Sequence, residues 1–352
     1  MKLNSIIIKG LWRKYDLQWN LDSRVNILTG SNGEGKSTIM DIIATVLLDS
    51  PQIKNLVSKF ERVNIDFDDK QTIVCISFND TLKNLKAKAE SGADNSVVFQ
   101  ELWDDVSSNL SLDDKRNKRL NRMGIKASVS YLVKNKKIAP LSESSIKNLK
   151  VDIISTFDSS LPTEIERGKY DSLKLQGVRS SLDWDLHDLQ EKYAYYLGGL
   201  ATKLEQYIKD GNTVDSMYVE NLYAQKNLFI KIVNEMFSET GKKININNSQ
   251  LEFIIDEENK HISMYDLSSG EKQLIYILLT VLMEEQKETV LFMDEPEISL
   301  HIDWQEQLID KILSLNPNCQ LLIATHAPSL LLGGWQSCVK NIADIKQQSN
   351  VQ

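Results

Sequence analysis

The sequence is poor in cysteine and proline. Its 352 residues include only 3 Cys and 6 Pro. Cys75, Cys319 and Cys338 are far apart and none belongs to a C-x-x-C pair, which excludes a disulfide framework and a structural zinc site. Widely spaced thiols of this kind are typical of a reducing compartment. We therefore expect a cytoplasmic protein.

Long hydrophobic runs are also lacking. The longest is LIYILLTVLM at residues 274–283, about half of what a membrane-spanning helix needs. The first 15 residues, MKLNSIIIKGLWRKY, contain no apolar run of the length that a secretion signal requires. The sequence thus predicts a soluble, unexported protein with no membrane partner. Hydrophobic residues make up 41% and charged residues 26% of the chain, near the average for globular proteins, so disorder is not indicated.

Negative charge outweighs positive charge except in one segment. The net charge is −8, yet the stretch from Lys115 to Lys150 carries eleven Lys or Arg against a single acid, Glu143. Such a basic segment is usually a solvated surface; the alternative is contact with DNA phosphates or with an acidic partner protein. Tyr131 is its one aromatic residue, so base stacking is not indicated, and any DNA contact would be to the backbone without sequence readout.

Hydrophobic periodicity predicts an α/β protein. Short β-branched or apolar runs predict strands at residues 3–9, 24–29, 62–67, 72–78, 151–156, 250–255, 289–295 and 320–326. Asp68 and Asp69 are turn residues and predict a hairpin between the third and fourth of these strands. Helices are expected from about Glu271 and from about Trp304, and a pair of helices over 182–237 is broken by KDGN at 209–212. The alternation in the last third indicates a sheet with parallel strands.

A glycine-rich loop follows the strand at 24–29. Residues 30–38 read GSNGEGKST and satisfy the phosphate-loop pattern, in which backbone N–H groups and a helix N-terminus converge on phosphate oxygens. The alternative is a tight turn from strand to helix, but the flanking strand and helix favour a phosphate loop. The candidate nucleotide-binding residues are Asn32, Gly33, Gly35, Lys36, Ser37 and Thr38. Lys36 is expected to reach the β and γ phosphates of ATP, and the Ser37 hydroxyl to bind Mg²⁺.

Hydrolysis of ATP also needs a carboxylate for the metal and a group that positions water. The apolar strand VLFM at residues 290–293 ends in Asp294 and Glu295. We predict that Asp294 binds Mg²⁺ and that Glu295 is the general base. An apolar run that ends in two acids is common by itself, and its pairing with the phosphate loop makes the interpretation specific.

Two further motifs carry a family resemblance. LSSGE at residues 267–271 resembles the signature motif of ABC-type ATPases, and QLLIATH ends in His326 where that family has its switch histidine. The resemblance implies that Ser268, Ser269 and Gly270 contact the nucleotide held by Lys36 of a second subunit. It further implies a homodimer or higher oligomer that closes around ATP, with His326 as a catalytic residue at the γ-phosphate.

The stretch DEPEISLH at residues 294–301 indicates the branch of the family. Transporter ATPases usually have Asp where this chain has His301. The stretch resembles instead the RecF, SMC and OLD-like branch and the ATP-binding proteins of bacterial anti-phage defence systems. The resemblance implies a P-loop fold with an ABC-type head, a mixed or parallel sheet and an inserted helical lobe.

The motifs suggest a division of the chain into four stretches. Residues 1–80 would form the N-terminal part of the head with the phosphate loop, and 261–352 its C-terminal part with the signature, the Asp-Glu strand and the switch histidine. Residues 81–150 would be a basic insertion or helical lobe, and 151–260 a strand followed by the helical pair.

Three departures from the family narrow the interpretation. The chain has no long heptad arm with a cysteine pair, as an SMC-like tether with a zinc hook would. Only 26 residues follow His326, too few for the Toprim nuclease domain of OLD proteins, so an effector is expected in trans. The metal-sensing glutamine is not evident, since Gln176 and Gln190 are both poorly placed.

Trp12, Arg13 and Tyr15 are candidates for the adenine contact, and each could equally serve in sheet packing.

The sequence thus predicts an ATPase that binds ATP and Mg²⁺ and works as a switch or scaffold. Closure of two copies around ATP would control a nuclease or toxin in anti-phage defence. The alternative is a RecF-like ATPase of DNA repair or chromosome maintenance. A third class is a nucleotide-binding structural protein without turnover, which an unaltered Glu295→Gln variant would support.

Overall fold

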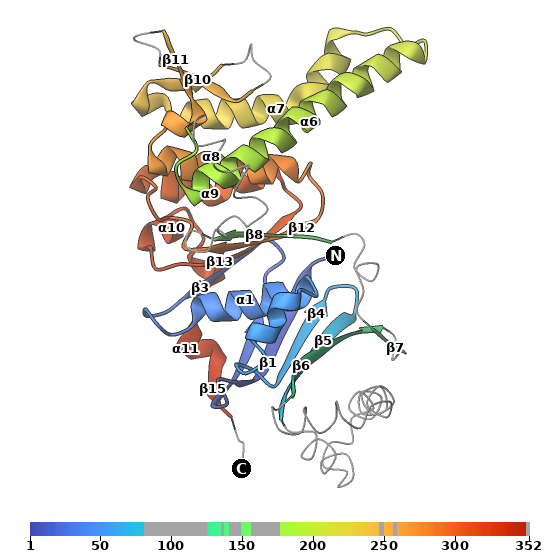
Figure 1. Ribbon diagram of the computed structural model, residues 1–352, viewed down its shortest axis with the longest axis vertical. Coiled ribbons are helices and arrows are strands. Elements are labelled where there is room, and N and C mark those ends of the chain that lie inside the picture. Colours follow the sequence, from blue (N-terminus) through green and yellow to red (C-terminus); the bar gives the residue numbers. More distant parts are fainter. Residues whose placement is uncertain are drawn as a thin grey trace. The chain divides into compact units, whose positions relative to one another are not determined.

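The chain folds into two compact units (Figure 1). The computed structural model describes residues 1–80, 125–134, 137–140, 149–155, 177–245, 250–255 and 259–349. Unit 1 contains residues 1–151 and 340–352, and unit 2 contains residues 152–339. The stretch that the sequence assigned to one C-terminal part, 261–352, is therefore divided, because its last residues return to unit 1.

Unit 1 is built on a 7-stranded antiparallel sheet in the order β15-β2-β1-β4-β5-β6-β7. Its strands are β1 (Leu3–Leu11), β2 (Tyr15–Asn20), β4 (Arg62–Phe67), β5 (Gln71–Asp80), β6 (Ile125–Lys134), β7 (Lys137–Pro140) and β15 (Lys346–Gln348). Alternation sets the core-facing side, since Ile6 and Ile8 of β1 are fully buried. The predicted strands at 3–9, 62–67 and 72–78 are confirmed. β2 was not among the predicted strands, although its residues YDLQWN alternate between apolar and polar side chains as a half-buried strand does.

The turn between β4 and β5 is the predicted one. The carboxylate of Asp69 accepts a hydrogen bond of 3.2 Å from the backbone N–H of Gln71. Lys70 has a φ of 65°, in the left-handed region that a tight turn requires. Asp68 and Asp69 therefore reverse the chain within three residues, and β4 and β5 pair in register from Arg62 opposite Ile76.

The described residues of the stretch predicted as a basic insertion or helical lobe, 81–150, are mostly extended. Within its described residues, β6 and β7 are strands that extend the sheet of unit 1 beyond β5. Antiparallel pairing of β6 with β5 and of β7 with β6 explains why these residues are extended, and only β7 is an edge strand. Residues 81–124 and 141–148, which hold most of the segment, lie outside the described residues.

Unit 1 also holds the strand and helix that flank the glycine loop. β3 (Val25–Thr29) lies beside β14 (Val339–Asn341), and α1 (Lys36–Leu47) follows the loop. Ile39, Ile42, Ile43 and Val46 of α1 are fully buried, at the spacing of one helix face. The remaining elements of the unit are η1 (Pro51–Asn55) and α11 (Ile342–Ile345).

Unit 2 is centred on two parallel strands. β12 (Thr289–Asp294) and β13 (Cys319–Ala324) pair in register, with β8 (Lys150–Ser155) beside β12. Residues 289–293 and all of β13 are buried, as is typical of a parallel sheet covered on both faces. The helices are α6 (Ser181–Lys209), α7 (Ser216–Met236), α8 (Ser269–Met283), α9 (Ile302–Leu315) and α10 (Pro328–Leu332). A small antiparallel sheet joins β9 (Lys242–Ile244), β10 (Glu252–Ile255) and β11 (Lys260–Ser263).

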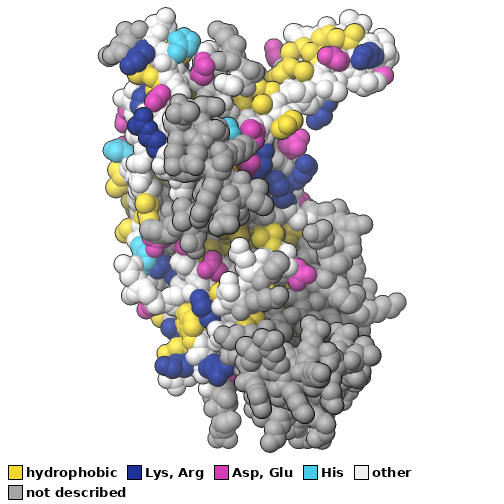
Figure 2. Space-filling view, viewed as in Figure 1, with side chains coloured by type: hydrophobic (Ala, Val, Ile, Leu, Met, Phe, Trp, Pro, Cys, Tyr) yellow, Lys and Arg dark blue, Asp and Glu magenta, His cyan; other side chains and the backbone are white. Residues whose placement is uncertain are grey.

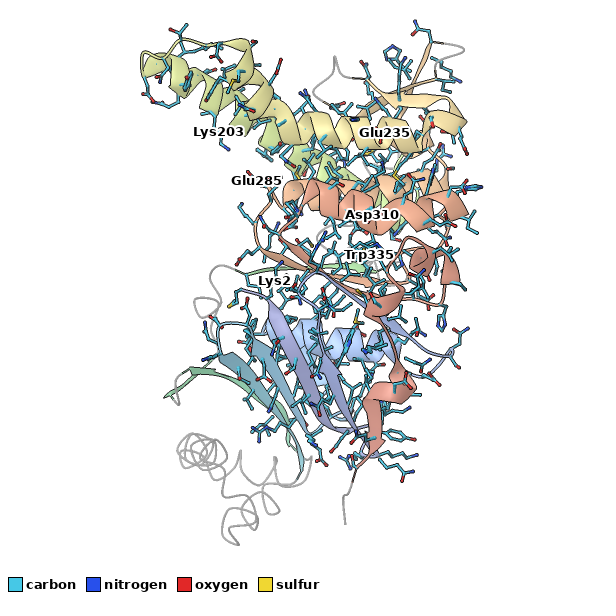
Figure 3. The ribbon with its side chains drawn as sticks, turned by 180° about the vertical axis from the view of Figure 1, so that it is seen from behind. Lys2, Lys203, Glu235, Glu285, Asp310 and Trp335 are labelled. Carbon is cyan, nitrogen blue, oxygen red and sulfur yellow. The ribbon has the colours of Figure 1, made fainter. Side chains whose placement is uncertain are left out.

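The helices of unit 2 form layers (Figure 1). α8 and α9 lie on one side of β12 and β13, and α6 and α7 lie beyond them. Amphipathic spacing in α9 produces this arrangement, since Trp304, Leu308, Ile312 and Leu315 are buried. Trp304 also donates a hydrogen bond of 2.8 Å from its indole nitrogen to the backbone oxygen of Met236 at the end of α7. Lys311 of α9 pairs with Glu235 of α7 at 2.8 Å, and Figure 3 labels Glu235 and Asp310 on these two neighbouring helices.

The predicted helical pair is an antiparallel hairpin of α6 and α7. Near its base the apolar side chains are buried, for example Leu186 and Phe229, both fully so. Its distal ends run out together away from α8 (Figure 1), and there Tyr207 and Tyr218 stack with ring centroids 3.7 Å apart. Hydrophobic side chains line the hairpin surface in Figure 2, and Met217 near the tip is 69% exposed. In the described parts of both units, no helix combines the length and apolarity needed to cross a bilayer.

Candidate functional site

The glycine loop leaves the N-terminus of α1 open. Gly35 is the residue before the helix, with a φ of 93°, and no side chain caps the first backbone N–H groups. A Cβ added at Gly33 would meet nothing within 4 Å, so the loop is open at that position. Unpaired N–H groups at a helix start, with the positive end of the helix dipole, bind anions. The local geometry therefore fits the phosphates of a nucleotide.

Lys36 folds back over this loop. Its side chain is 4% exposed, and the ammonium donates to the backbone oxygens of Gly30 at 3.1 Å and Ser31 at 3.4 Å. Glu34 is the second charged group here, since its carboxylate accepts a hydrogen bond of 2.9 Å from the N–H of Ser31. The loop thus holds one cation and one anion, and that anion occupies one of the loop's own N–H donors.

Trp12 lies against the same loop. The six-membered part of its indole ring fills the space that a Cβ at Gly35 would take. The turn between β1 and β2 holds it there, because Trp12 and Arg13 both have a positive φ, of 51° and 58°. Tyr15 at the start of β2 meets Trp12 edge to face at 6.4 Å. Of the three candidates for an adenine contact, Trp12 is thus the one whose ring the structure places on the phosphate loop.

The Asp-Glu pair stands at the carboxyl end of β12. Asp294 is the last residue of the strand and pairs in register with Ala324 of β13. Glu295 continues this register through a hydrogen bond of 2.8 Å from its N–H to the oxygen of Ala324, and its φ of 48° then turns the chain sharply. The carboxyl ends of neighbouring parallel strands meet at one edge of the sheet, where ligands of α/β proteins bind.

Glu295 and His326 meet at this edge. The Oε1 of Glu295 lies 3.3 Å from the Nε2 of His326, and the two side chains are 23% and 31% exposed. Both are therefore accessible from solvent and close enough to share a proton or a water molecule. The carboxylate of Asp294, one residue earlier in the chain, is of the oxygen-donor type that Mg²⁺ prefers, as is the hydroxyl of Ser37 in unit 1.

The signature residues form the start of α8. Ser268 is the N-cap, and its hydroxyl oxygen accepts a hydrogen bond of 3.3 Å from the N–H of Glu271, while Glu271 accepts one of 2.8 Å from the N–H of Ser268. This capping box leaves the O–H of Ser268 free to donate. Ser268 and Ser269 are exposed, whereas Gly270 is buried. A Cβ at Gly270 would collide with the backbone oxygen of Ser299, so only glycine fits there.

Glu271 is held by a partly buried ion pair that the sequence did not indicate. The ammonium of Lys242 on β9 lies 2.8 Å from both carboxylate oxygens of Glu271, which is 1% exposed. Burial raises the pKa of Glu271, but the hydrogen bonds from Lys242 and Ser268 outweigh it and hold the pKa below its usual value. No local sequence motif predicts the pairing of Lys242 with Glu271, because Lys242 lies 29 residues before its partner.

The predicted site residues thus fall into two sets. Unit 1 holds the phosphate-loop residues Asn32, Gly33, Gly35, Lys36, Ser37 and Thr38. Unit 2 holds Asp294, Glu295 and His326 at the sheet edge and Ser268, Ser269 and Gly270 at the start of α8. Within unit 2 the structure brings Glu295 to His326, and Gly270 to Ser299 in the turn that follows Glu295. Gln190, one candidate for the metal-sensing glutamine, lies in α6; Gln176 is outside the described residues.

Comparison with known proteins identifies the family. Residues 1–331 match the model of the AAA ATPase domain, and the chain belongs to this family. It is 22% identical to the retron Vc95 probable ATPase of Vibrio cholerae serotype O1 biovar El Tor, over 88% of this chain and 67% of the relative. It is 21% identical to the Septu protein PtuA of Bacillus thuringiensis, over 94% of this chain and 72% of the relative.

Among solved structures, the chain is similar to SMC head domains. The SMC head domain from Thermotoga maritima aligns over 100% of both chains with 12% identity and a TM-score of 0.44. The SMC head bound to the C-terminal winged-helix domain of ScpA aligns over 94% of this chain and 91% of that chain, with 14% identity and a TM-score of 0.44.

Proposed function

We propose that this chain hydrolyses ATP, that two copies close around two ATP molecules, and that this closure controls an effector protein in anti-phage defence. The proposal rests on one observation above all, the 3.3 Å approach of Glu295 to His326 at the carboxyl ends of two buried parallel strands. A carboxylate and an imidazole at that edge supply the proton acceptor and the polar contact that phosphoryl transfer to water needs.

Each site residue has one role in this proposal. Lys36 and the N–H groups at the start of α1 bind the β and γ phosphates, and Glu295 accepts the proton of the attacking water. His326 contacts the γ-phosphate and keeps the Glu295 carboxylate oriented. Ser37 and Asp294 hold Mg²⁺, which neutralises charge on the phosphates when bound. Trp12 offers an aromatic face to the adenine beside the loop.

The start of α8 completes the site of a second subunit. Exposed Ser268 and Ser269 present hydroxyl donors, and the positive end of the α8 dipole adds an anion-binding contribution. The partly buried pair of Glu271 and Lys242 fixes this helix start, so its donors are preorganised. An open N-terminus on the surface is well suited to a phosphate that arrives with another subunit, and dimerisation would then require ATP.

The defence role follows from the relatives. Two proteins that this chain resembles are named as components of a retron and of a Septu system, and the DEPEISLH stretch resembles ATPases of the same anti-phage class. We assign to this chain the part of a nucleotide-driven switch, which acts on a nuclease or toxin supplied by another chain. A nuclease, toxin or reverse transcriptase gene beside this one supports that part, and isolation among repair genes contradicts it.

The test combines turnover with mass. Wild-type protein should release phosphate from ATP with Mg²⁺, and Glu295→Gln should not. The Glu295→Gln protein should double its mass or enlarge further only when ATP and Mg²⁺ are present, as measured by light scattering. The same variant with Lys36→Ala added should remain at the smaller mass. A mass that is indifferent to ATP contradicts closure around the nucleotide.

The composite site has its own test. Lys36→Ala and Ser268→Glu each remove one half of the site, and each protein alone should be inactive. When the two are mixed, the heterodimer contains one site with both halves intact, so activity should recover to about one quarter of wild type for random pairing of subunits. If the mixture stays inactive while wild type turns over, the sites are not shared between subunits.

A further inference from the structure

Glu297 is a buried carboxylate two residues after the proposed general base. It is 8% exposed, and one of its oxygens, Oε1, accepts hydrogen bonds from three donors of the segment that follows β13. These are the hydroxyl of Thr325, the N–H of His326 at 3.2 Å and the N–H of Ala327 at 3.2 Å. The hydroxyl oxygen of Thr325 also accepts a hydrogen bond of 2.9 Å from Ala327. A single carboxylate oxygen therefore organises the backbone on both sides of His326.

The backbone of Glu297 is held by contacts other than those of its carboxylate. Its backbone oxygen accepts a hydrogen bond of 3.0 Å from the N–H of Leu300 and one of 3.3 Å from the side-chain amide of Gln305 on α9. The amide oxygen of Gln305 in turn accepts a hydrogen bond from the hydroxyl of Ser329. The backbone of Glu297 is thus hydrogen-bonded to α9 and to the turn after β12, while its carboxylate is hydrogen-bonded to the chain after β13.

Stability alone does not explain a carboxylate here. The second oxygen, Oε2, is buried and has no hydrogen-bond partner among the described residues. A buried charge that is only partly hydrogen-bonded costs free energy, and an apolar side chain of similar size usually serves packing better. What the carboxylate provides and an apolar side chain cannot is a strong acceptor for three donors at once. Those donors surround His326 and no other proposed site residue.

We infer that Glu297 is a positioning residue that holds His326 against Glu295. The inference rests on the proposed ATPase activity, in which these two side chains act together. The turn at residues 295–298 is closed by a hydrogen bond of 3.1 Å from the N–H of Ile298 to the oxygen of Glu295. Glu297 therefore fixes the positions of both residues. It holds Glu295 through this turn and His326 through the hydrogen bonds of its carboxylate. Their separation of 3.3 Å is a consequence of that shared anchor.

A double-mutant cycle tests this role. Glu297→Ala should lower kcat for ATP by roughly 10–100-fold, the usual effect of displacing a reacting group by about an ångström, and leave KM within about twofold. Added to His326→Ala, the same substitution should lower kcat by less than about threefold, because the residue that it positions is already gone. Glu297→Gln keeps an oxygen acceptor for the three donors, and should retain kcat within about threefold of wild type.

Glu284 provides a matched control at the opposite end of β12. It is 1% exposed and accepts a hydrogen bond of 2.8 Å from the hydroxyl of Thr289, so it is also a buried glutamate bound to a threonine. Glu284→Ala should lower Tm and leave kcat within about twofold of wild type. If Glu297→Ala does not fold, Thr325→Val takes its place in the cycle with His326→Ala, since it removes one of the three donors.

The outcomes distinguish failure of the positioning role of Glu297 from failure of the proposed ATPase activity. Equal losses of kcat from the Glu297 substitution, with and without His326, overturn the positioning role, as does a rise of KM at constant kcat. In both cases wild-type turnover keeps the proposed function intact. Absence of phosphate release from wild-type protein overturns the ATPase proposal itself, and the role of Glu297 with it.

Discussion

The ammonium of Lys272 lies 2.7 Å from the carboxylate of Asp183 and joins the start of α8 to the start of α6. The preceding residue, Glu271, is paired with Lys242, which follows the end of α7. Two consecutive residues directly after the signature Gly270 are thus bound to the two roots of the helical hairpin. The hairpin and the predicted nucleotide-contacting start of α8 are therefore parts of one electrostatic network within unit 2.

Removal of Lys272 should destabilise the protein strongly. Asp183 is 1% exposed, and Lys272→Met would leave its buried charge without the ammonium, at a cost of about 3 kcal/mol in the free energy of unfolding. Urea denaturation measures this loss. Lys192→Met is the matched control on α6, because its pair with Asp188 is 58% and 57% exposed and should contribute less than about 1 kcal/mol. Equal losses in the two variants would show that the Asp183 pair is not a structural anchor.

Asp185 should make the protein less stable as pH rises. Burial, followed by the nearby charge of Asp188, raises the pKa of Asp185 to about 6. The folded protein disfavours the ionised form, so ionisation of Asp185 lowers the free energy of unfolding. This loss is absent below the unfolded pKa of about 4, grows as the pH rises toward 6 and is complete above pH 6. Asp185→Asn should therefore raise the free energy of unfolding at pH 8 by on the order of 1–2 kcal/mol and change it little at pH 4.

The measurement for Asp185 is a set of urea titrations between pH 4 and pH 8. Glu205→Gln, at an exposed position of the same helix, serves as the control and should leave the pH dependence of wild type unchanged. A constant difference between Asp185→Asn and wild type across this range would contradict the raised pKa.

Trp12 should contribute to nucleotide affinity. Stacking of an aromatic ring on a base is worth about 1–3 kcal/mol, so Trp12→Ala should weaken ATP binding about 10-fold or more. Calorimetric titration of the Glu295→Gln background measures binding without turnover. Trp12→Phe retains an aromatic face and should lose less than Trp12→Ala. If free triphosphate binding weakens as much as ATP binding, Trp12 supports the loop through Gly35 and does not contact adenine.

Glu34 should oppose the binding of phosphate groups. Its carboxylate accepts the N–H of Ser31 inside the glycine loop, where a negative charge repels another anion. Glu34→Gln keeps an acceptor for that N–H and removes the charge, so ATP should bind about threefold more tightly at low ionic strength, with a smaller gain in high salt. Glu61→Gln, an exposed carboxylate elsewhere in unit 1, should have no such effect. Unchanged affinity at low salt would mean that Glu34 moves away before the phosphates enter.

Local patterns in the sequence predicted the elements that carry local signals. The buried strands β12 and β13, the β4–β5 turn at Asp68 and Asp69, and the α6–α7 hairpin all followed from periodicity and turn chemistry over a few residues. β2 was missed although YDLQWN has the alternation of a strand, because the sequence analysis treated Trp12, Arg13 and Tyr15 only as candidates for the adenine contact or for packing. The sequence analysis also did not predict that β6 and β7 extend the sheet. Their lysines resemble those of a solvated insertion, and pairing with β5 is a property of the tertiary structure.

The motifs likewise located the predicted site but not its supports. Asp294, Glu295 and His326 were predicted from their order along the chain, whereas the hydrogen bonds of Glu297, in the same DEPE stretch, to residues 325–327 are visible only in the structure. Lys242 carries no motif, and Asp183 carries only the local capping box with Ser180, which does not reveal its pairing with Lys272. Their partners lie on another helix, and single-sequence patterns report chemistry along the chain better than pairing across it.

The hairpin of α6 and α7 has the dimensions of a lever arm. From its buried root at Asp183 to Lys209 at its far end, α6 extends about 40 Å at 1.5 Å per residue. A tilt of only about 5° at the root, set by the start of α8, would displace the tip by about 3 Å. A small rotation at the start of α8 would thereby become a larger displacement at the tip of the hairpin, where another protein could detect it.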